Sequence, residues 1–294
     1  MMGVLNVYKE KGFTSHDVVA IIRRVIGVKK VGHTGTLDPD ATGVLPICIG
    51  SATKFAEYIA SADKTYVAEV ILGIETNTGD ISGKILAQKA VDFHQNTIAD
   101  TVMSFSFKKR GEYMQTPPMF SAIKIGGKKL YELARKGEEI HRPARPVLIH
   151  AIDVLEFDAK KNAFTIRVKC SKGTYIRSLA MDIGQQLGCG ATMGKLERIQ
   201  SGMFAIDTAI TLDKIKEATQ NGKLHDFIIS MDALLPYPKI QVFGNELKLA
   251  MNGNPLPYDS VILDVSDKYW VCNNDTIIGL FSRNANKLCP EVML

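Results

Sequence analysis

The sequence predicts an α+β fold with a largely antiparallel sheet. Two segments, residues 64–72 and 163–170, alternate apolar and polar side chains as half-buried strands do. Two others, residues 18–26 and 176–187, carry apolar side chains at the three- and four-residue spacing of a helix. Helices and strands do not follow each other in the regular rhythm that a parallel sheet needs. With 294 residues, 46% of them hydrophobic, the chain can bury a sizeable core.

The first fifty residues contain a strand, a helix and a segment without regular periodicity. Gly3 to Tyr8 is typical of a short strand. Thr14, followed three residues later by Asp17, predicts that a helix begins there, and Gly27 predicts where it ends. Residues 32–50 are rich in glycine and proline, so we expect an ordered loop over this whole stretch.

The middle of the chain adds a helix and an excursion from the core. Ile98, Val102 and Phe105 mark one face of an amphipathic helix. Residues 111–146 are rich in proline, glycine and lysine, which indicates a segment that leaves the core. Residues 172–175 form a turn at the N-terminus of the helix over 176–187, a position that favours binding.

The last part of the chain has the composition of a separate small domain. Prolines follow Leu235, and we place a domain boundary near Pro236. Beyond it we expect one short helix and several strands. The helix spans residues 246–251, and the strands span 261–263, 269–272 and 276–281.

Charge is unevenly distributed along the chain. The net charge is +5, yet residues 237–294 hold five Lys and Arg against six Asp and Glu. The positive excess gathers in residues 9–30, 108–110 and 124–145. Such clusters suit a polyanionic partner, although solvated helix faces would give the same pattern.

Several classes of protein are excluded or disfavoured. Arg23 and Arg24 interrupt the longest apolar run, which excludes a membrane-spanning helix, and no secretory signal precedes it. The five cysteines are widely spaced without a CxxC pair, so we expect a cytoplasmic protein without disulfides or a metal site. The Gly-Lys and Gly-Cys-Gly pairs lack the spacing of a P-loop or of a dinucleotide-binding motif.

The loop that begins at Gly32 combines small residues with His33 and Asp38. A carboxylate held in such a loop can act as a nucleophile or a base where water is excluded. Asp38 before Pro39 is equally consistent with a turn-forming side chain. Residues 38–42 also match the DxDxT spacing of aspartate-nucleophile phosphatases, but the buried strand that precedes that motif is missing.

Residues 32–54, GHTGTLDPDATGVLPICIGSATK, resemble the catalytic motif of the TruB-type tRNA pseudouridine synthases. That family isomerises uridine 55 in the TΨC loop. Four further segments, 9–17, 64–66, 171–177 and 187–204, resemble the family's other motifs in the same order. The resemblance implies a pseudouridine-synthase catalytic domain over residues 1–236, a basic RNA-gripping thumb over about 108–147, and a small PUA-like β domain over 237–294.

The resemblance also implies a role for each matched residue. Asp38 would be the catalytic aspartate, acting on the uridine by attack or by proton abstraction from the sugar. Arg177 would pair with Asp38 and keep it ionised, since an opposite charge lowers the pKa of a carboxylate. Tyr66 would stack on the flipped base and could take the proton from C5. Of the other residues, Tyr175 and Leu196 would line the base pocket, His33 would enter the RNA loop, and Lys9 would contact the substrate or support the catalytic loop.

The implied reaction needs no redox equivalent, phosphate donor or metal, so we expect no cofactor. The implied partner is the T arm of tRNA, bound by a monomer. Two positions depart from the family's pattern: Glu10 replaces a usual proline, and Glu197 interrupts a usual Leu-Arg-Arg run. A non-catalytic module that binds or folds tRNA through the same basic surface is the alternative function.

Overall fold

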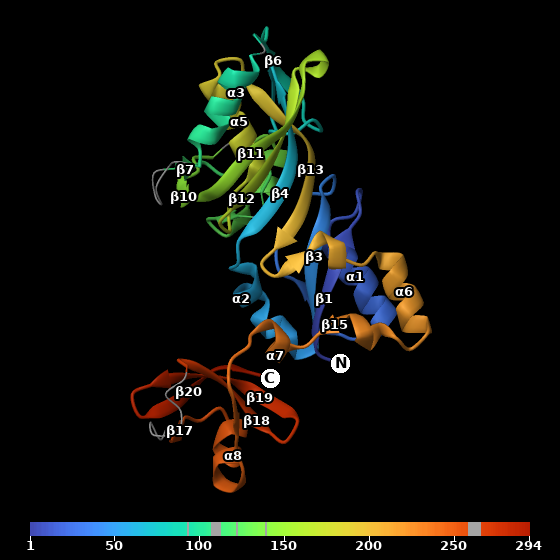
Figure 1. Ribbon diagram of the computed structural model, residues 1–294, viewed down its shortest axis with the longest axis vertical. Helices are drawn as coiled ribbons and strands as arrows, with labels where there is room; N and C mark the ends of the chain where they lie inside the picture. Colours follow the sequence, from blue (N-terminus) through green and yellow to red (C-terminus); the bar gives the residue numbers. More distant parts are fainter. Residues whose placement is uncertain (93, 107–112, 122, 139, 258–265) are drawn as a thin grey trace.

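The computed structural model describes residues 1–92, 94–106, 113–121, 123–138, 140–257 and 266–294. The molecule is elongated, with a central sheet that runs through its upper and middle parts and a smaller sheet at its lower end (Figure 1). No helix in these ranges is both long and apolar enough to span a membrane.

The central sheet has nine strands in the described part of the chain. All its strand pairs there are antiparallel except a short parallel pairing of β13 with β3, which confirms the predicted sheet type. In spatial order the strands are β11 (Ile149–Asp158), β12 (Ala163–Cys170), β4 (Lys64–Leu72), β13 (Ala191–Ser201), β3 (Thr42–Ile49), β1 (Gly3–Lys9) and β15 (Ile228–Ile229), with β2 (Val31–His33) beside β3 and β14 (Phe204–Ala205) beside β13.

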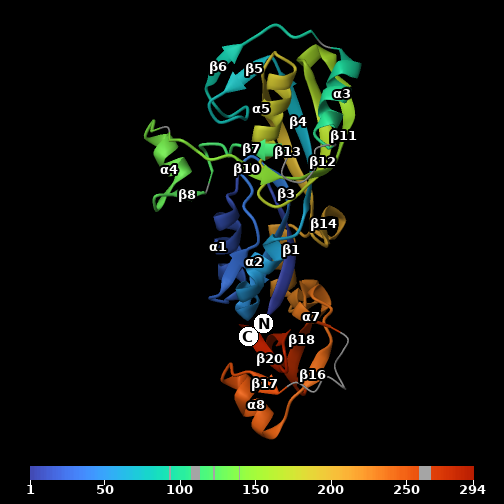
Figure 2. The same ribbon diagram turned by 90° about the vertical axis from the view of Figure 1, so that its left-hand side faces the viewer.

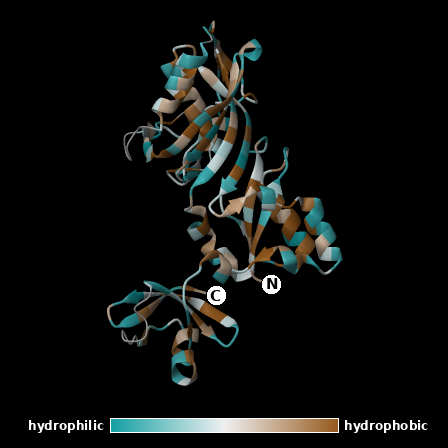
Figure 3. Ribbon diagram, viewed as in Figure 1, coloured by the Kyte–Doolittle hydropathy of each residue, from teal (hydrophilic) through white to brown (hydrophobic). Residues whose placement is uncertain are grey.

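Helices cover the sheet in two groups. Helix α1 (Ser15–Ile26) starts with the predicted capping box of Thr14 and Asp17 and ends at Gly27 in the left-handed conformation. It packs against α6 (Leu212–Gln220) beside the β1–β3 half, and α3 (Gln95–Ser104) and α5 (Ile176–Gln186) cover the other half. One apolar core underlies both groups. The outer turns of α6 carry hydrophilic residues (Figure 3). Each Ile, Leu or Val fully buried there contributes about 1.5–3 kcal/mol.

The expectation of a loop over residues 32–50 is wrong for most of that stretch. Strands β2 and β3 occupy its two ends, and the loop is confined to residues 34–41. Residues 43–49 are fully buried between neighbouring strands, so packing outweighs the local preference of Gly43 and Pro46. Pro46 has no N–H to donate, but its carbonyl is still hydrogen-bonded: it accepts from the Thr34 backbone N–H at 3.1 Å.

The predicted excursion is an insertion that projects from the sheet beside α1 (Figure 2). We refer to residues 113–147 as the insertion. Strands β7 (Tyr113–Gln115) and β10 (Arg145–Val147) pair at its base, and a small apolar cluster around Leu130 and Leu133 holds its tip. The tip comprises β8 (Lys124–Ile125), β9 (Lys128–Lys129) and α4 (Leu130–Arg135). The basic residues 108–110 lie outside the described residues.

The lower sheet contains the C-terminal strands. Its order is β16 (Lys239–Gln241), β18 (Lys268–Asn273), β19 (Thr276–Asn284), β20 (Lys287–Met293) and β17 (Leu256–Pro257), with α8 (Gly244–Met251) beside it. The strand expected over residues 261–263 lies outside the described residues. Trp270 joins this sheet to the rest: its ring packs on Phe55 at 5.5 Å, and its Nε1 donates to the Leu235 carbonyl at 2.7 Å. The remaining elements are α2 (Ala56–Ala60), β5 (Ile74–Thr76), β6 (Ile85–Gln88) and α7 (Met231–Leu234).

Candidate active site

The loop between β2 and β3 presents Asp38, and both of its neighbours in the chain are tethered. The Ser15 hydroxyl donates to the Leu37 carbonyl at 3.2 Å and accepts from the Leu37 N–H at 2.9 Å. On the other side, Lys9 Nζ donates to the Pro39 carbonyl at 3.1 Å. The backbone on each side of Asp38 is therefore held by a side chain from residues 9–17, one of the segments that carry the family resemblance.

Lys9 is fully buried and does not reach either cavity described below. Its ammonium group also donates to the carbonyls of Glu10, at 3.1 Å, and Phe13, at 2.6 Å. Burial lowers the pKa of Lys9 to about 8, against the opposing effect of Asp38. Lys9 thus supports the loop. Glu10 supplies a backbone carbonyl that any residue would supply, so the departure from proline leaves this contact intact.

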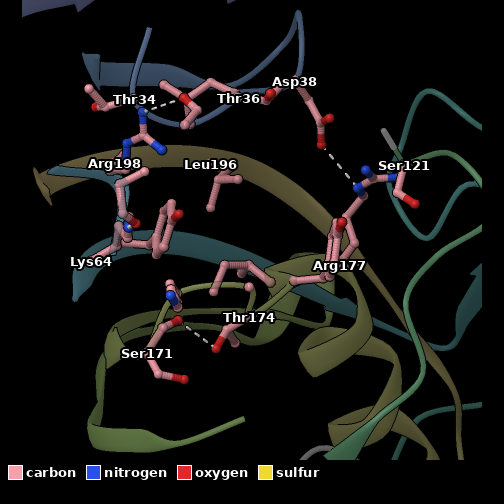
Figure 4. A pocket seen from close by; sticks show the side chains of 18 residues that line it. Thr34, Thr36, Asp38, Lys64, Ser121, Ser171, Thr174, Arg177, Leu196 and Arg198 are labelled. Atoms are coloured by element: carbon pink, nitrogen blue, oxygen red, sulfur yellow. Dashed lines mark hydrogen bonds and ion pairs between the residues drawn. The ribbon is translucent and has the colours of Figure 1, made fainter. Parts of the chain in front are cut away.

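Arg177, in the first turn of α5, faces Asp38 across the cleft (Figure 4). Its Nε lies 3.0 Å from Asp38 Oδ2. Its Nη1 donates to the Thr78 carbonyl at 3.0 Å, and its Nη2 donates to the Phe120 carbonyl at 2.9 Å. The side chain is 5% exposed, so the guanidinium is oriented by three partners before any ligand arrives.

A second carboxylate, which the sequence analysis missed, belongs to this arrangement. Asp80 Oδ2 lies 3.8 Å from Arg177 Nε. Its Oδ1 accepts from Thr78 Oγ1 at 2.8 Å and from the Ser82 N–H at 3.0 Å. Thr78 and Ser82 on either side of Asp80 indicate a turn in the sequence, but nothing in these residues indicates that the turn folds against α5.

Asp38 has a raised pKa, chiefly because the surrounding protein partly desolvates its carboxylate, although the side chain remains 39% exposed at the cleft. Arg177 lowers the pKa of Asp38, as predicted, and Asp80 raises it. The expected ion pair is therefore present, but desolvation outweighs its effect on the pKa.

Asp38 and Arg177 lie at one end of a cavity of about 290 Å³. This volume is at the lower limit for ligand pockets, roughly 300 Å³, and suits a single base better than a folded nucleic acid. Tyr66, expected to stack on the base, lines this cavity, and so do Tyr175 and Leu196, which were expected to line the base pocket. Lys64 and Arg198 lie at the opposite end from Asp38 (Figure 4).

Tyr66 and Arg198 are cross-strand partners on β4 and β13. Arg198 is 2% exposed; its Nε donates to the Val44 carbonyl at 2.7 Å, and its Nη2 donates to the Gly35 carbonyl at 3.2 Å. Burial raises the pKa of Tyr66, while the guanidinium of Arg198 lowers it. Tyr66 is accordingly a neutral phenol at rest. Arg198, the arginine that remains of the usual Leu-Arg-Arg run and was expected beside the pocket, ties β13 to the Asp38 loop.

His33 ends β2 and is not among the described residues that line the cavity. Its ring meets the ring of His16 edge-on, with 5.3 Å between centroids. Its Nδ1 accepts from the Gly35 N–H at 3.3 Å. Burial, with help from His16 and Arg198, lowers the pKa of His33 and favours the neutral ring.

A larger cleft of about 1300 Å³ meets the small cavity at Asp38, Arg177 and Ser121. Residues of the insertion and of the N-terminus of α1 line it. Glu197 also lines it, and its carboxylate accepts from the Tyr8 hydroxyl at 2.9 Å and from Thr42 Oγ1 at 3.4 Å. The acid that replaces a usual arginine thus joins β13 to β1 and β3. Within the described ranges, no three His, Cys, Asp or Glu side chains are grouped so as to hold a metal.

Family models match most of the chain. A model described as TruB family pseudouridylate synthase (N terminal domain) matches residues 23–176, and one described as tRNA pseudouridylate synthase B C-terminal domain matches residues 177–236. This chain belongs to the TruB family. The lower sheet lies beyond both matched stretches.

TruB family relatives resemble the chain over most of its length. The tRNA pseudouridine synthase B of Alkaliphilus oremlandii is 49% identical over 90% of this chain and 85% of its own. The enzyme of that name from Clostridium novyi is 46% identical and is covered in full, as is this chain. That of Bacillus anthracis is 41% identical over 97% of this chain and 93% of its own.

Two solved structures share the TruB-like fold. A chain in the crystal structure of a Cbf5-Nop10-Gar1 complex superposes with a TM-score of 0.71 at 26% identity, over 99% of this chain and 84% of that one. A chain in an H/ACA RNP bound to a substrate RNA containing 2'-deoxyuridine superposes with a TM-score of 0.69 at 25% identity, with the same coverage.

Proposed function

We propose that this protein is an isomerase that converts uridine to pseudouridine in tRNA, at position 55 in the T arm. The observation that carries the proposal is the Asp38–Arg177 pair, 3.0 Å apart, at one end of a base-sized cavity. Membership of the TruB family, whose named relatives are tRNA pseudouridine synthases, supports the substrate class.

The reaction is an exchange of bonds within one nucleoside. The bond from C1' to N1 breaks, the uracil turns, and a bond forms from C1' to C5. The proton at C5 is lost and N1 gains one, so uridine and pseudouridine are isomers. Asp38 acts on the sugar by attack at C1' or by proton abstraction. A desolvated carboxylate is suited to either role, because its negative charge is poorly stabilised by water.

The detached base has to be kept from solvent between these steps. Extruding it from the T loop costs a few kcal/mol of stacking and pairing, which apolar and aromatic pocket walls can offset. Tyr66 and Leu196 supply such walls. Tyr66 stacks as a neutral phenol, so it must lose its own proton before it can take the one from C5. N1 of the detached base can accept the phenol proton, and the nearby Arg198 favours the phenolate until it takes the C5 proton. Tyr175 completes the pocket, and His33, outside it, enters the space that the uridine leaves in the RNA.

The insertion forms most of the thumb, which spans about residues 108–147 and grips phosphates. Exposed cations on its tip and edge, Lys124, Lys128, Arg135 and Lys136, support this role. We further propose a catalytic domain over 1–236 and a PUA-like domain over 237–294. The acid–guanidinium pair is complete within one chain, which suits a monomer, and five free thiols suit the cytoplasm.

The test follows tritium released from C5 of uridine in a labelled T-arm stem-loop. The wild-type protein should release it, and Asp38→Asn should reduce the rate by at least roughly 10³-fold, because the essential carboxylate is lost. Asp40→Asn is the matched control: that carboxylate is 65% exposed, 3.7 Å from Lys11, and its loss should leave the rate within a few-fold. No release from the wild type, with RNA binding intact, would favour the alternative of a non-catalytic tRNA-binding module.

A further inference from the structure

Ser121 brings a buried hydroxyl to the meeting point of the two cavities. The residue is 5% exposed, and it lines both the small cavity and the larger cleft. Within the described residues its Oγ makes no hydrogen bond of normal geometry. Buried hydroxyls in native proteins nearly always have a partner, so an unsatisfied one in the wall of a cavity calls for a ligand that supplies it.

The backbone around Ser121 is held firmly enough to aim this hydroxyl. Arg177 Nη2 donates to the carbonyl of the preceding Phe120 at 2.9 Å. The Tyr131 N–H donates to the carbonyl of Ser121 itself at 3.1 Å. The Ser121 hydroxyl also lies near the phenol of Tyr175: a weak side-chain interaction between the two, short of normal hydrogen-bond geometry, partly offsets the rise that burial causes in the pKa of Tyr175.

Its place in the cavity indicates which part of a nucleotide it meets. Ser121 lies beside Arg177, at the Asp38 end, and away from Lys64 and Arg198 (Figure 4). Under the proposed function, on which this inference rests, the Asp38 end addresses the sugar and the Tyr66 end holds the base. A ribose inside an RNA chain has one free hydroxyl, at C2', which both donates and accepts hydrogen bonds. A serine hydroxyl does the same and matches it in either direction.

We propose that Ser121 hydrogen-bonds the 2'-hydroxyl of the flipped uridine and so positions the ribose against Asp38. Ser121 is then a substrate-binding residue that distinguishes a ribonucleotide from a deoxyribonucleotide at the target position. Its hydroxyl has no partner of normal geometry among the described residues of the free protein because the substrate provides that partner.

The binding test uses two T-arm stem-loop RNAs that differ only in uridine or 2'-deoxyuridine at the target. Both are bound by Asp38→Asn protein, which does not turn them over. We expect this protein to prefer uridine by about three- to tenfold in Kd, the range of one net hydrogen bond. The double variant Asp38→Asn/Ser121→Ala should bind both RNAs equally. An unchanged preference in the double variant, or no preference when Ser121 is present, would overturn the assignment.

A second measurement separates binding from folding. Ser178, also buried at 2% exposure, has its hydroxyl satisfied by the Thr116 carbonyl at 2.9 Å. Ser178→Ala should lower Tm and keep the preference for uridine, whereas Ser121→Ala should leave Tm unchanged or raise it. A fall in Tm for Ser121→Ala as large as that for Ser178→Ala would make the hydroxyl structural and overturn the inference.

Tritium release by protein with Asp38 intact reports on the proposed function independently. Release by the wild type, together with an unchanged ribose preference in Ser121→Ala protein, would overturn the role of Ser121 alone. No release would overturn the proposed function and this inference with it.

Discussion

The two walls of the cleft are held in different ways. One, which we call the loop wall, consists of residues 34–41 with β13. It is fixed by two buried cations, Lys9 and Arg198, whose donors point at backbone carbonyls. The other, the insertion wall, is residues 113–121. The Gln115 amide holds it to α5 by accepting from the Tyr175 N–H at 2.7 Å and donating to the Tyr175 carbonyl at 3.0 Å.

This difference bears on how firmly each wall of the cleft is held. Displacing the loop wall would leave buried ammonium and guanidinium groups without partners, which is costly. Displacing the insertion wall breaks the neutral hydrogen bonds of the Gln115 amide, each with a net value of about 1 kcal/mol, and also two bonds to charged groups, from Arg177 to the Phe120 carbonyl and from the Tyr113 hydroxyl to Asp182. The two walls therefore differ in how much of their anchoring is neutral, and under the proposed function the insertion wall is the one that faces the RNA. Arg177 contacts both, through Asp38 and through the Phe120 carbonyl.

Arg177→Gln should have the largest effect, because it breaks the link between the walls. We expect kcat/KM to fall by roughly 10²- to 10³-fold. Removing the positive charge also raises the pKa of Asp38 further, so the acid limb of the pH–rate profile should move to higher pH. Arg177→Lys is the control: it keeps the charge and should shift the limb less. An acid limb that stays in place in Arg177→Gln would contradict this account of Asp38.

Lys9→Met should damage the loop wall alone. Three carbonyls lose a charged donor, and we expect the free energy of unfolding to fall by about 2–4 kcal/mol, with a loss of activity. Denaturant titration measures this. Lys11→Met is the matched control, because its ammonium group is exposed and lies 3.7 Å from Asp40, a pair expected to contribute under about 1 kcal/mol. Equal losses from the two variants would show that burial of Lys9 does not matter.

The wild-type protein and Lys9→Met should also differ in how the free energy of unfolding depends on pH. The pKa of Lys9 is lowered to about 8 in the folded protein, so between pH 8 and 10.5 the unfolded chain binds more protons there. Lys9 therefore favours folding more as pH rises through this window. The free energy of unfolding of wild type minus that of Lys9→Met should increase by up to about 3 kcal/mol. Subtracting the variant removes the contributions of other groups, and a flat difference would contradict a lowered pKa.

Gln115→Ala should have the smallest effect, confined to the insertion wall. We expect a loss of about 1–3 kcal/mol in stability, from three neutral hydrogen bonds, two to the Tyr175 backbone and one to the Tyr113 hydroxyl. KM for the stem-loop should rise more than kcat falls, since under the proposed function this wall grips RNA and does not carry Asp38. Gln186→Ala, which removes an exposed contact of 3.3 Å to Ser104, is the control and should change neither. A fall in kcat alone would show that both walls carry chemistry.

Elements with a local signal could be predicted, and those without one could not. The capping box at Thr14 and the alternation over 64–72 and 163–170 led to α1, β4 and β12, because each pattern is set by neighbours in sequence. Residues 42–49 were expected to be loop, since their glycine and proline outweighed a run whose burial depends on strands far away in the chain. The family resemblance indicated Asp38, Tyr66 and Arg177, whose proximity in the cleft is a tertiary result.

Sequence by itself determined most of the segments that form regular structure, because periodicity and capping are local properties, and its resemblance to the TruB family indicated Asp38, Tyr66 and Arg177 as candidate site residues. Tertiary structure decided what surrounds Asp38. Asp80, Arg198 and Ser121 reach the site only because a turn, a strand and the insertion converge on α5 and the Asp38 loop. Burial, and with it the raised pKa of Asp38, is likewise a property of that convergence, since desolvation depends on atoms brought together from across the fold.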